Sequence, residues 1–237
     1  MNIVILTGAG ISAESGVPTF RGLDGLWEGH RIEDVATPEA FIRNPALVQG
    51  FYNLRRSKLL RAEVSPNPAH HALARLAREH QGRVLLITQN IDDLHERAGL
   101  PHVLHMHGEL MKSRCIRCGA VSPCTGDLYH GTPCFSCHRT RTLRPHVVWF
   151  GEMPFHLEEI SAALSSANLF VAIGTSGHVY PAAGFVRWAS DAGARTMEIN
   201  LDESAASEWF DESRRGPAGV LVPIWVEEVL QTSKVRD

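Results

Sequence analysis

Four of the five cysteines form two C-x-x-C pairs with fifteen residues between them: Cys115, Cys118, Cys134 and Cys137. This spacing is typical of four thiolates that hold one zinc ion in a tetrahedron. Because four protein ligands leave no open coordination position, such a zinc would stabilise the fold and take no part in a reaction. The alternatives are four packed or idle thiols, or replacement of one ligand by Cys124 or His138.

A second chemical pattern lies in the stretch IVILTGAGISAESGVPTF, where a short apolar run leads into G-x-G-x-x-[G/A] at Gly8, Gly10 and Ala13. Such a turn can put backbone N–H groups on a phosphate at a helix N-terminus. A dehydrogenase would continue the helix into a second strand with an acid about twenty positions beyond the glycines. Here Gly16 and Pro18 end the helix, and Asp24 lies in a Gly-rich loop. The pattern therefore fits two alternatives. The turn binds a nucleotide without the usual ribose-binding acid, or it is a tight turn that binds nothing.

Polar residues also follow several predicted strands. Segments rich in β-branched residues predict strands at 3–6, 84–88, 169–173 and 195–201, with helical patterns between several of them. Gln89, Asn90, Ile91 and Asp92 follow the second strand, and similar sets follow the third and fourth. Since the carboxyl ends of parallel strands share one edge, these residues should line one crevice. Helix capping by Asn90 or Asp92, and plain loops elsewhere, are the alternatives.

The predicted fold class is α/β, a Rossmann-like parallel sheet with helices on both faces. Asn44-Pro45 and Asn67-Pro68 predict helices that begin near 45 and 68, and Pro181 predicts another. Residues 22–65 show no strand pattern, and 109–144 are rich in Cys, Gly, Pro, Thr and Arg. We predict a single catalytic domain over 1–237. It has a nucleotide-binding core at 1–24, 66–108 and 145–237, a helical insertion at 25–65 and a zinc module at 109–144.

Bulk composition narrows the partners. The 237 residues carry a formal net charge of −3 with no clustered Lys/Arg surplus, which argues against nucleic acid as the main partner. No apolar run approaches the ~18 residues of a membrane span. Because a strand-like run begins almost at once, at Ile3, we expect no cleavable leader. With an odd number of cysteines, mostly in metal-type pairs, we expect a cytoplasmic protein.

Seven blocks in order carry a family resemblance: GAGISAESGVPTFRG, TQNIDDLHERAG, HMHGEL, a C-x-x-C pair, RPHVVWFGE, AIGTSGHVYPAAG and EINLD. Over residues 3 to about 225 the chain resembles the sirtuins, NAD-dependent protein deacylases, and most closely the short bacterial type that also resembles the mitochondrial desuccinylase. The resemblance implies attack of an acyl-lysine carbonyl oxygen on the nicotinamide-bearing ribose carbon. Nicotinamide leaves, and free lysine and O-acyl-ADP-ribose result.

The resemblance also assigns residues. His107 corresponds to the general base, a role that suits an imidazole of ordinary pKa ~6.5; His105 should point to the opposite face of its strand. Asn90 joins His107 in the catalytic set, and residues 15–27 would cover NAD. The implied NAD contacts are Gly8, Ala9, Gly10, Ile11, Ser12, Glu14, Thr19, Phe20, Arg21, Trp27, Gln89, Asn90, Ile91, Asp92, Gly174, Thr175, Ser176, Asn200, Leu201, Asp202 and Ala218.

For the substrate, the family pairs a strand at 147–151 with the substrate backbone, which implicates Val148, Phe150 and Gly151. Tyr52 and Arg55 share a helix face at i,i+3 and could grip a carboxylate, while Ala36 matches the subtype with a roomy acyl pocket. The alternative places Tyr52 in a packed seam and Arg55, Arg56 and Lys58 on a solvated face.

The resemblance therefore implies removal of acetyl groups and also of acidic acyl groups, succinyl above all, from lysine in protein substrates. NAD would be the co-substrate, with one structural zinc ion, and we expect a monomer that binds no membrane. Mono-ADP-ribosyl transfer to protein is an alternative that shares the departure of nicotinamide. A non-catalytic zinc-ribbon binding module is a third.

Overall fold

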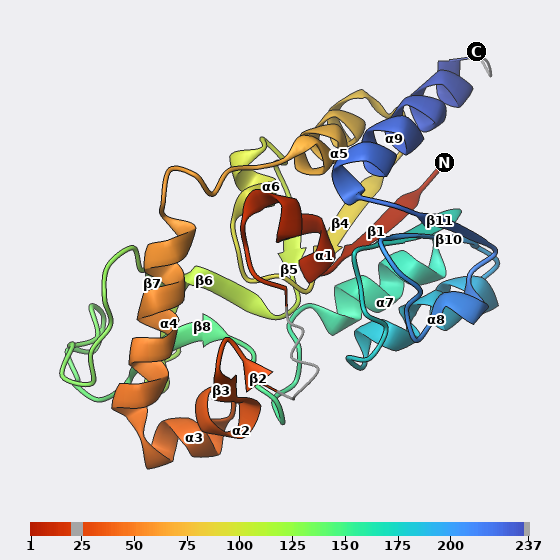
Figure 1. Ribbon diagram of the computed structural model, residues 1–237. Helices are drawn as coiled ribbons and strands as arrows, with labels where there is room; N and C mark the ends of the chain where they lie inside the picture. Colours follow the sequence, from red (N-terminus) through yellow and green to blue (C-terminus); the bar gives the residue numbers. More distant parts are fainter. Residues whose placement is uncertain (20–25, 235–237) are drawn as a thin grey trace.

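Six parallel strands form one sheet in the order β11-β10-β9-β1-β4-β5 (Figure 1) in the computed structural model, which describes residues 1–19 and 26–234. Their bounds are β1 Ile3–Thr7, β4 Val84–Thr88, β5 Val103–His105, β9 Leu169–Ile173, β10 Arg195–Asn200 and β11 Glu212–Arg215. The four predicted strands are confirmed, with differences of one residue at two ends. After β1 the chain first forms β4 and β5 on one side of this strand and then β9, β10 and β11 on the other side. The direction in which strands are added to the sheet therefore reverses beside β1. Ligands of open α/β sheets bind at such a point.

Alternating side chains of β1 explain why helices cover both faces of the sheet. Ile3 and Ile5 lie in the cluster that packs against α5 (Pro68–Glu79) and α9 (Ala218–Lys234). Val4 and Leu6 lie in the opposite cluster, with α7 (Leu157–Ser165) and α8 (Phe185–Asp191). Figure 1 shows the two helix pairs on opposite sides of the strands. The expected fold class is confirmed.

The predicted helix starts are also confirmed. The Asn44 side chain accepts a hydrogen bond from Leu47 N at 3.1 Å, and α4 (Pro45–Leu59) begins at the following proline. The Asn67 side chain accepts one from Ala69 N at 3.0 Å at the start of α5. Pro181 precedes a short 3-10 turn, η2 (Ala182–Gly184), that leads into α8. The remaining short elements are α1 Ala9–Ser12, η1 Ala13–Ser15, α6 Leu94–Arg97 and η3 Ser207–Trp209.

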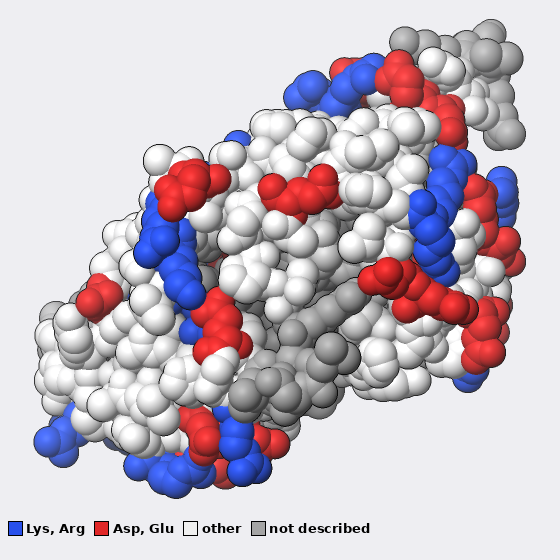
Figure 2. All heavy atoms as spheres, in the orientation of Figure 1, with Lys and Arg blue, Asp and Glu red and all other residues white. Residues whose placement is uncertain are grey.

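A second group of elements packs beside the sheet. Helices α2 (Ile32–Val35), α3 (Pro38–Arg43) and α4 share a buried cluster with β6 and the residues that follow β8. In the antiparallel sheet β7-β6-β8, the strands are β7 Val121–Pro123, β6 Gly108–Cys115 and β8 Leu143–Val147. On the face drawn in Figure 2, acidic and basic side chains are interspersed among the other residues. Within the described ranges, no helix combines the length and apolar character that a bilayer crossing requires.

One expectation about residues 22–65 is wrong, because the described part of this segment contains a small hairpin. Strands β2 (Leu26–Trp27) and β3 (His30–Arg31) pair antiparallel. Glu28 and Gly29 form the turn with φ of 46° and 80°, the left-handed conformation that two-residue hairpins use. Strands of two residues are too short to show alternation of apolar and polar side chains, so the pattern could not be found in the sequence.

Candidate active site

A cavity of about 550 Å³ opens at the carboxyl ends of β1, β4 and β9 and extends to α4. Most of the residues expected to contact NAD or substrate line it, although they come from distant parts of the chain. These are Gly8, Ala9, Gly10, Ser12, Thr19, Trp27, Ala36, Tyr52, Arg55, Gln89, Asn90, Ile91, Asp92, His107, Val148, Phe150, Gly151, Gly174, Thr175 and Ser176.

The other expected contacts lie outside the described lining of this cavity. Ile11 is fully buried in the core, and Ala218 begins α9. The Glu14 carboxylate accepts a hydrogen bond from Gly219 N at 2.9 Å, and the Asn200 side chain donates one to Thr175 O at 2.7 Å. Leu201 and Asp202 follow Asn200 at the end of β10. Phe20 and Arg21 lie outside the described residues.

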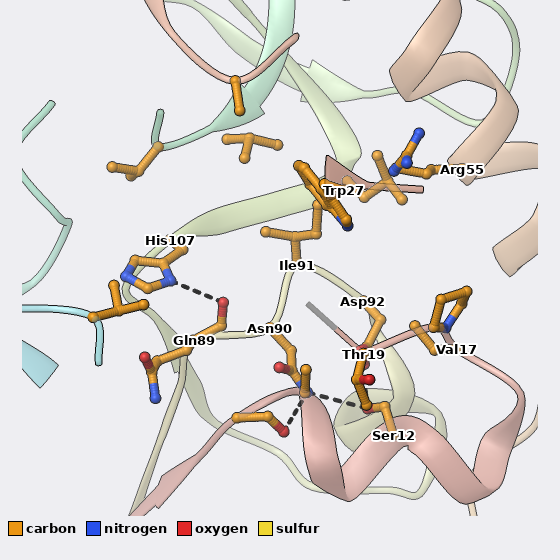
Figure 3. A pocket seen from close by; sticks show the side chains of 18 of the residues that line it. Ser12, Val17, Thr19, Trp27, Arg55, Gln89, Asn90, Ile91, Asp92 and His107 are labelled. Carbon is orange, nitrogen blue, oxygen red and sulfur yellow. Dashed lines mark hydrogen bonds between the residues drawn. The ribbon is translucent and has the colours of Figure 1, made fainter. Parts of the chain in front are cut away.

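A chain of hydrogen bonds orients the polar residues that follow β4 (Figure 3). Asn90 Nδ2 donates to Gly8 O and to Ser12 Oγ, both at 3.1 Å, and Ser12 Oγ donates to Asp92 Oδ2 at 3.0 Å. Asp92 Oδ1 also accepts from Leu94 N at 3.2 Å, at the start of α6. Asp92 thus lines the cavity and also accepts a hydrogen bond from the first residue of α6, while contact with NAD stays a prediction.

Asp92 carries an unusual carboxyl group. Burial raises its pKa from 3.8 to about 6, although the hydrogen bonds from Leu94 N and Ser12 Oγ partly oppose that rise. A buried acid with a displaced pKa in a cavity is a frequent feature of functional sites.

His107 lies in the turn between β5 and β6, two residues after the strand end, and faces the cavity. Its Nδ1 is 3.0 Å from Gln89 O, and burial lowers its pKa below 6.5 while that hydrogen bond opposes the change. His105 also directs Nδ1 to a backbone oxygen, that of Asn90, but it differs in its position and in the partner of Nε2. It lies outside the described cavity lining, its Nε2 is 2.7 Å from Glu96 Oε1, and its pKa is raised because the hydrogen bond and charge of Glu96 outweigh burial.

The glycine turn is less free to bind a phosphate than its sequence implies. Gly8 N donates to Ile173 O, Gly10 N to Gly174 O, and Ile11 N back to Gly8 O. The helix that follows is broken as expected, since α1 and η1 together end at Gly16, which has φ of 81°. Of the turn's first amides, Ala9 N is the one not used by these three bonds.

At the α4 end of the cavity, Tyr52 and Arg55 are both buried, with Tyr52 fully so and Arg55 8 % exposed. Tyr52 Oη accepts a hydrogen bond from Trp149 Nε1 at 2.9 Å, and burial raises the Tyr52 pKa well above its usual value, so the phenol keeps its proton. Arg55 stacks on Phe51, with the guanidinium carbon 3.1 Å from the ring centroid. A solvated face for Arg55 and its neighbour Arg56, which is 1 % exposed, is therefore wrong.

The strand expected at 147–151 ends early, at Val147. Val148 N donates to His107 O, and Phe150 N donates to Ala36 O. The Glu152 carboxylate accepts from Trp149 N at 2.8 Å, which bends the chain into a turn at Phe150 and Gly151. The strand is therefore shorter than expected, and hydrogen bonds to His107, Ala36 and Glu152 hold the residues after it in the cavity lining. Pairing of these residues with a substrate backbone stays a prediction.

The four cysteines converge away from the cavity. Their Sγ atoms all lie within 4.8 Å of one another, with Cys115–Cys137 at 3.8 Å and Cys118–Cys134 at 3.7 Å. A tetrahedral zinc with Zn–S bonds of ~2.3 Å requires sulfur atoms ~3.8 Å apart, so the four thiols fit the ion. Cys124 instead directs its Sγ to Gly126 O, outside this cluster. Of the candidate ligand sets, the four paired cysteines are the one that the structure assembles.

Two structural roles were not foreseen from the sequence. The Arg56 guanidinium donates to Leu110 O and Gly126 O, and so ties α4 to the segment that holds the cysteines. Glu28 places its carboxylate 3.0 Å from both Arg55 Nη2 and Lys58 Nζ in the cavity wall. An acidic residue in a Glu-Gly turn was the only sequence signal for the second role.

Comparison with known proteins agrees with this geometry. The model of the Sir2 family matches residues 8–181. An NAD-dependent protein deacylase of Vibrio vulnificus (strain YJ016) is 59% identical over 229 residues, which cover 97% of this chain and 94% of the relative.

Two solved structures share the fold. A Sir2 homologue in complex with NAD is 40% identical at a TM-score of 0.88, over 98% of this chain and 90% of that one. A Sir2–p53 peptide–NAD+ complex is 29% identical at a TM-score of 0.80, over 99% and 94%. The chain belongs to the Sir2 family.

Proposed function

We propose that the protein is an NAD-dependent protein lysine deacylase that removes acetyl groups and, through Tyr52 and Arg55, succinyl and similar acidic acyl groups. One observation carries the proposal: a single cavity joins the His107 imidazole to the buried Arg55 guanidinium. Figure 3 places these two side chains on opposite sides of the view, with Ile91 between them. The relatives named for NAD-dependent deacylation and the NAD-bound Sir2 structure support the reaction class.

When bound, NAD supplies the electrophilic ribose carbon and nicotinamide as the leaving group. The residues after β4 would hold it, since Asn90 and Asp92 are fixed by Ser12 and the start of α6. His107 would accept a proton at Nε2 from a ribose hydroxyl. The apolar walls, including Ile91, Val148 and Phe150, would keep water from the reacting carbon.

At the acyl end, an acetyl group needs only the apolar walls around Ala36, whereas a succinyl group brings a carboxylate. Tyr52 offers a neutral phenol, and Arg55 a guanidinium fork, both buried where a charged hydrogen bond is strong. The pair is therefore the feature by which the two acyl classes would be distinguished.

The proposal is tested with one peptide carrying either acetyl- or succinyl-lysine, with and without NAD, by mass spectrometry of the products. We expect nicotinamide and O-acyl-ADP-ribose only with NAD, and loss of both in His107→Ala but not in His102→Ala, which removes an exposed histidine. Absence of acyl-ADP-ribose would refute deacylation, and ADP-ribose retained on protein would instead favour ADP-ribosyl transfer.

The acyl class is tested by Arg55→Met. We expect kcat/KM for the succinyl peptide to fall about 10- to 150-fold, the equivalent of roughly 1.5–3 kcal/mol for a lost charged contact. The acetyl peptide should lose much less. Equal losses on both peptides, with an unchanged Tm, would mean that Arg55 acts through packing alone.

A further inference from the structure

The carboxylate of Glu28 lies beside the guanidinium that the carboxylate of a dicarboxylic acyl group would have to contact. Its Oε2 is 3.0 Å from Arg55 Nη2 and 3.0 Å from Lys58 Nζ. The three side chains are 18 %, 8 % and 39 % exposed respectively, so the contact with Arg55 is the more buried of the two. All three line the cavity at its α4 end.

Arg55 is held in place but not satisfied. Its Nη1 donates to Phe51 O at 2.9 Å, and its ring contacts with Phe51 and Trp27 fix the plane of the guanidinium. Its Nε and Nη2 have no hydrogen-bond acceptor among the described residues, because the Glu28 oxygen lies near Nη2 without hydrogen-bond geometry. The Nε/Nη2 edge is the one that carboxylates bind with two parallel hydrogen bonds. Glu28 therefore neutralises this edge without occupying it.

The balance of charge in this group leaves room for one more anion. Two cations, Arg55 and Lys58, share the single carboxylate of Glu28. A second carboxylate on the Nε/Nη2 edge would give each cation one partner, with Glu28 kept by Lys58. Lys58 is more exposed than Arg55, so the remaining Glu28–Lys58 ion pair would be partly solvated by water.

The backbone at Glu28 is compatible with such a movement. Glu28 is the first residue of the β2–β3 turn and has a φ of 46°, which is uncommon for a residue other than glycine. The two-residue turn itself requires this positive φ, so the hairpin holds the backbone of Glu28 and the movement falls on its side chain.

We propose that Glu28 is a specificity residue, an internal carboxylate that competes with the carboxylate of a dicarboxylic acyl group for Arg55 and passes to Lys58 when that group binds. The inference rests on the proposed deacylase function and adds to it. Acetyl-lysine, which carries no acyl carboxylate, would leave the Glu28–Arg55 contact intact. The protein would thus accept both acyl classes, with Glu28 setting the ratio between them.

The test compares Glu28→Gln, Lys58→Gln and the double variant with Glu33→Gln, which removes an exposed carboxylate from the next helix. The readouts are the succinyl-to-acetyl ratio of kcat/KM and the Kd of a fluorescent succinyl-lysine peptide by anisotropy. We expect Glu28→Gln to raise the ratio and lower the Kd about threefold to tenfold. Lys58→Gln should move both the other way, but only while Glu28 is present.

The outcomes separate the possibilities. A fall in the ratio in Glu28→Gln, or no change beyond that of Glu33→Gln, would overturn the proposal, because Glu28 would then position Arg55 or do nothing for the acyl group. If Lys58→Gln has the same effect with Glu28 present and in the Glu28→Gln variant, Lys58 attracts the acyl carboxylate directly. That result would overturn the proposal that Glu28 passes from Arg55 to Lys58. If neither peptide yields O-acyl-ADP-ribose with the unaltered protein, it is the proposed function that fails.

Discussion

His107 Nδ1 lies 3.0 Å from the backbone oxygen of Gln89, and this contact decides which ring nitrogen can act as a base. A carbonyl oxygen only accepts hydrogen bonds, so Nδ1 must carry the proton of the neutral ring, and the lone pair remains on Nε2. The two nitrogens of His105 face Asn90 O and the Glu96 carboxylate, and both of these acceptors favour the protonated ring, which raises the pKa of His105 against the effect of burial.

The pH dependence of the reaction should follow His107, with a contribution from the Asp92 carboxyl group, whose pKa of about 6 puts its titration in the same range. Burial lowers its pKa below 6.5, and only the neutral ring can accept a proton. We therefore expect kcat/KM to be constant above about pH 6.5 and to fall as the pH drops through the lowered pKa. The measurement is kcat/KM for the acetyl peptide from pH 5 to 8, with circular dichroism to confirm folding at each pH. An inflection above pH 7 would contradict the assignment.

Asp92→Asn should make the protein more stable and less active. The folded-state pKa of about 6 lies above the ordinary 3.8, so the buried carboxylate destabilises the fold wherever it is ionised. That penalty is absent below about pH 4, grows as the pH rises to about 6 and is complete above, on the order of 3 kcal/mol. Asparagine removes the charge and can still accept from Leu94 N.

Thermal unfolding from pH 4.5 to 7.5 tests this expectation. The gain in Tm of Asp92→Asn should increase across that range and then level off. NAD consumption by the variant should fall, because residues that destabilise a fold at a functional site often serve its activity. A gain in Tm that is the same at every pH would show that charge burial is not its cause.

The parts of the fold that were predictable from sequence rest on local physics. Buried parallel strands need continuous apolar runs, so β4 and β9 were found with their observed bounds. An asparagine before a proline marks a helix start, because its side chain accepts a hydrogen bond from a backbone N–H of the first turn and the proline ring sets a helical φ. This signal located the starts of α4 and α5. Both signals lie within a few residues of the feature that they predict.

What failed depends on contacts between distant segments. A run such as 147–151 looks like a strand, but Glu152, His107 and Ala36 provide competing hydrogen bonds that only the folded chain assembles. The family motif identified His107 and the residues after β4, yet it carried no information on which amides of the glycine turn are already used. The Glu28 contact with Arg55 joins a hairpin to a helix, and no spacing rule connects them.

Loss of zinc should loosen the cysteine segment while the parallel sheet stays folded. The buried apolar cluster there is small, Cys115, Leu128, Cys134 and Leu143, so it needs the metal cross-link. We expect Cys134→Ser to lose bound zinc and to show faster hydrogen exchange over 109–144 than over β1 and β4. Cys124→Ser is the matched control and should keep one zinc per chain. Zinc loss in that control would reassign a ligand.

The last prediction concerns the packing of Gly10 against Gly174. A Cβ added at Gly10 would lie 2.7 Å from Gly174 Cα, and Gly174 itself has φ of 63°, so the neighbouring backbone has little freedom to move. The glycine turn is thus required by contact between β9 and the first helix as well as by any phosphate. We expect Gly10→Ala to destabilise the fold by about 1–3 kcal/mol in urea unfolding.

Gly50→Ala is the matched control, because Gly50 lies inside α4, is exposed, and has no atom within 4 Å of the added Cβ. It should stabilise the protein by about 0.5–1 kcal/mol, since alanine favours a helix and restricts the unfolded chain. If Gly10→Ala were as stable as the unaltered protein but failed to bind NAD, the glycine would serve the phosphate alone. Loss of stability without NAD present would instead establish the packing role, because no ligand takes part in that measurement.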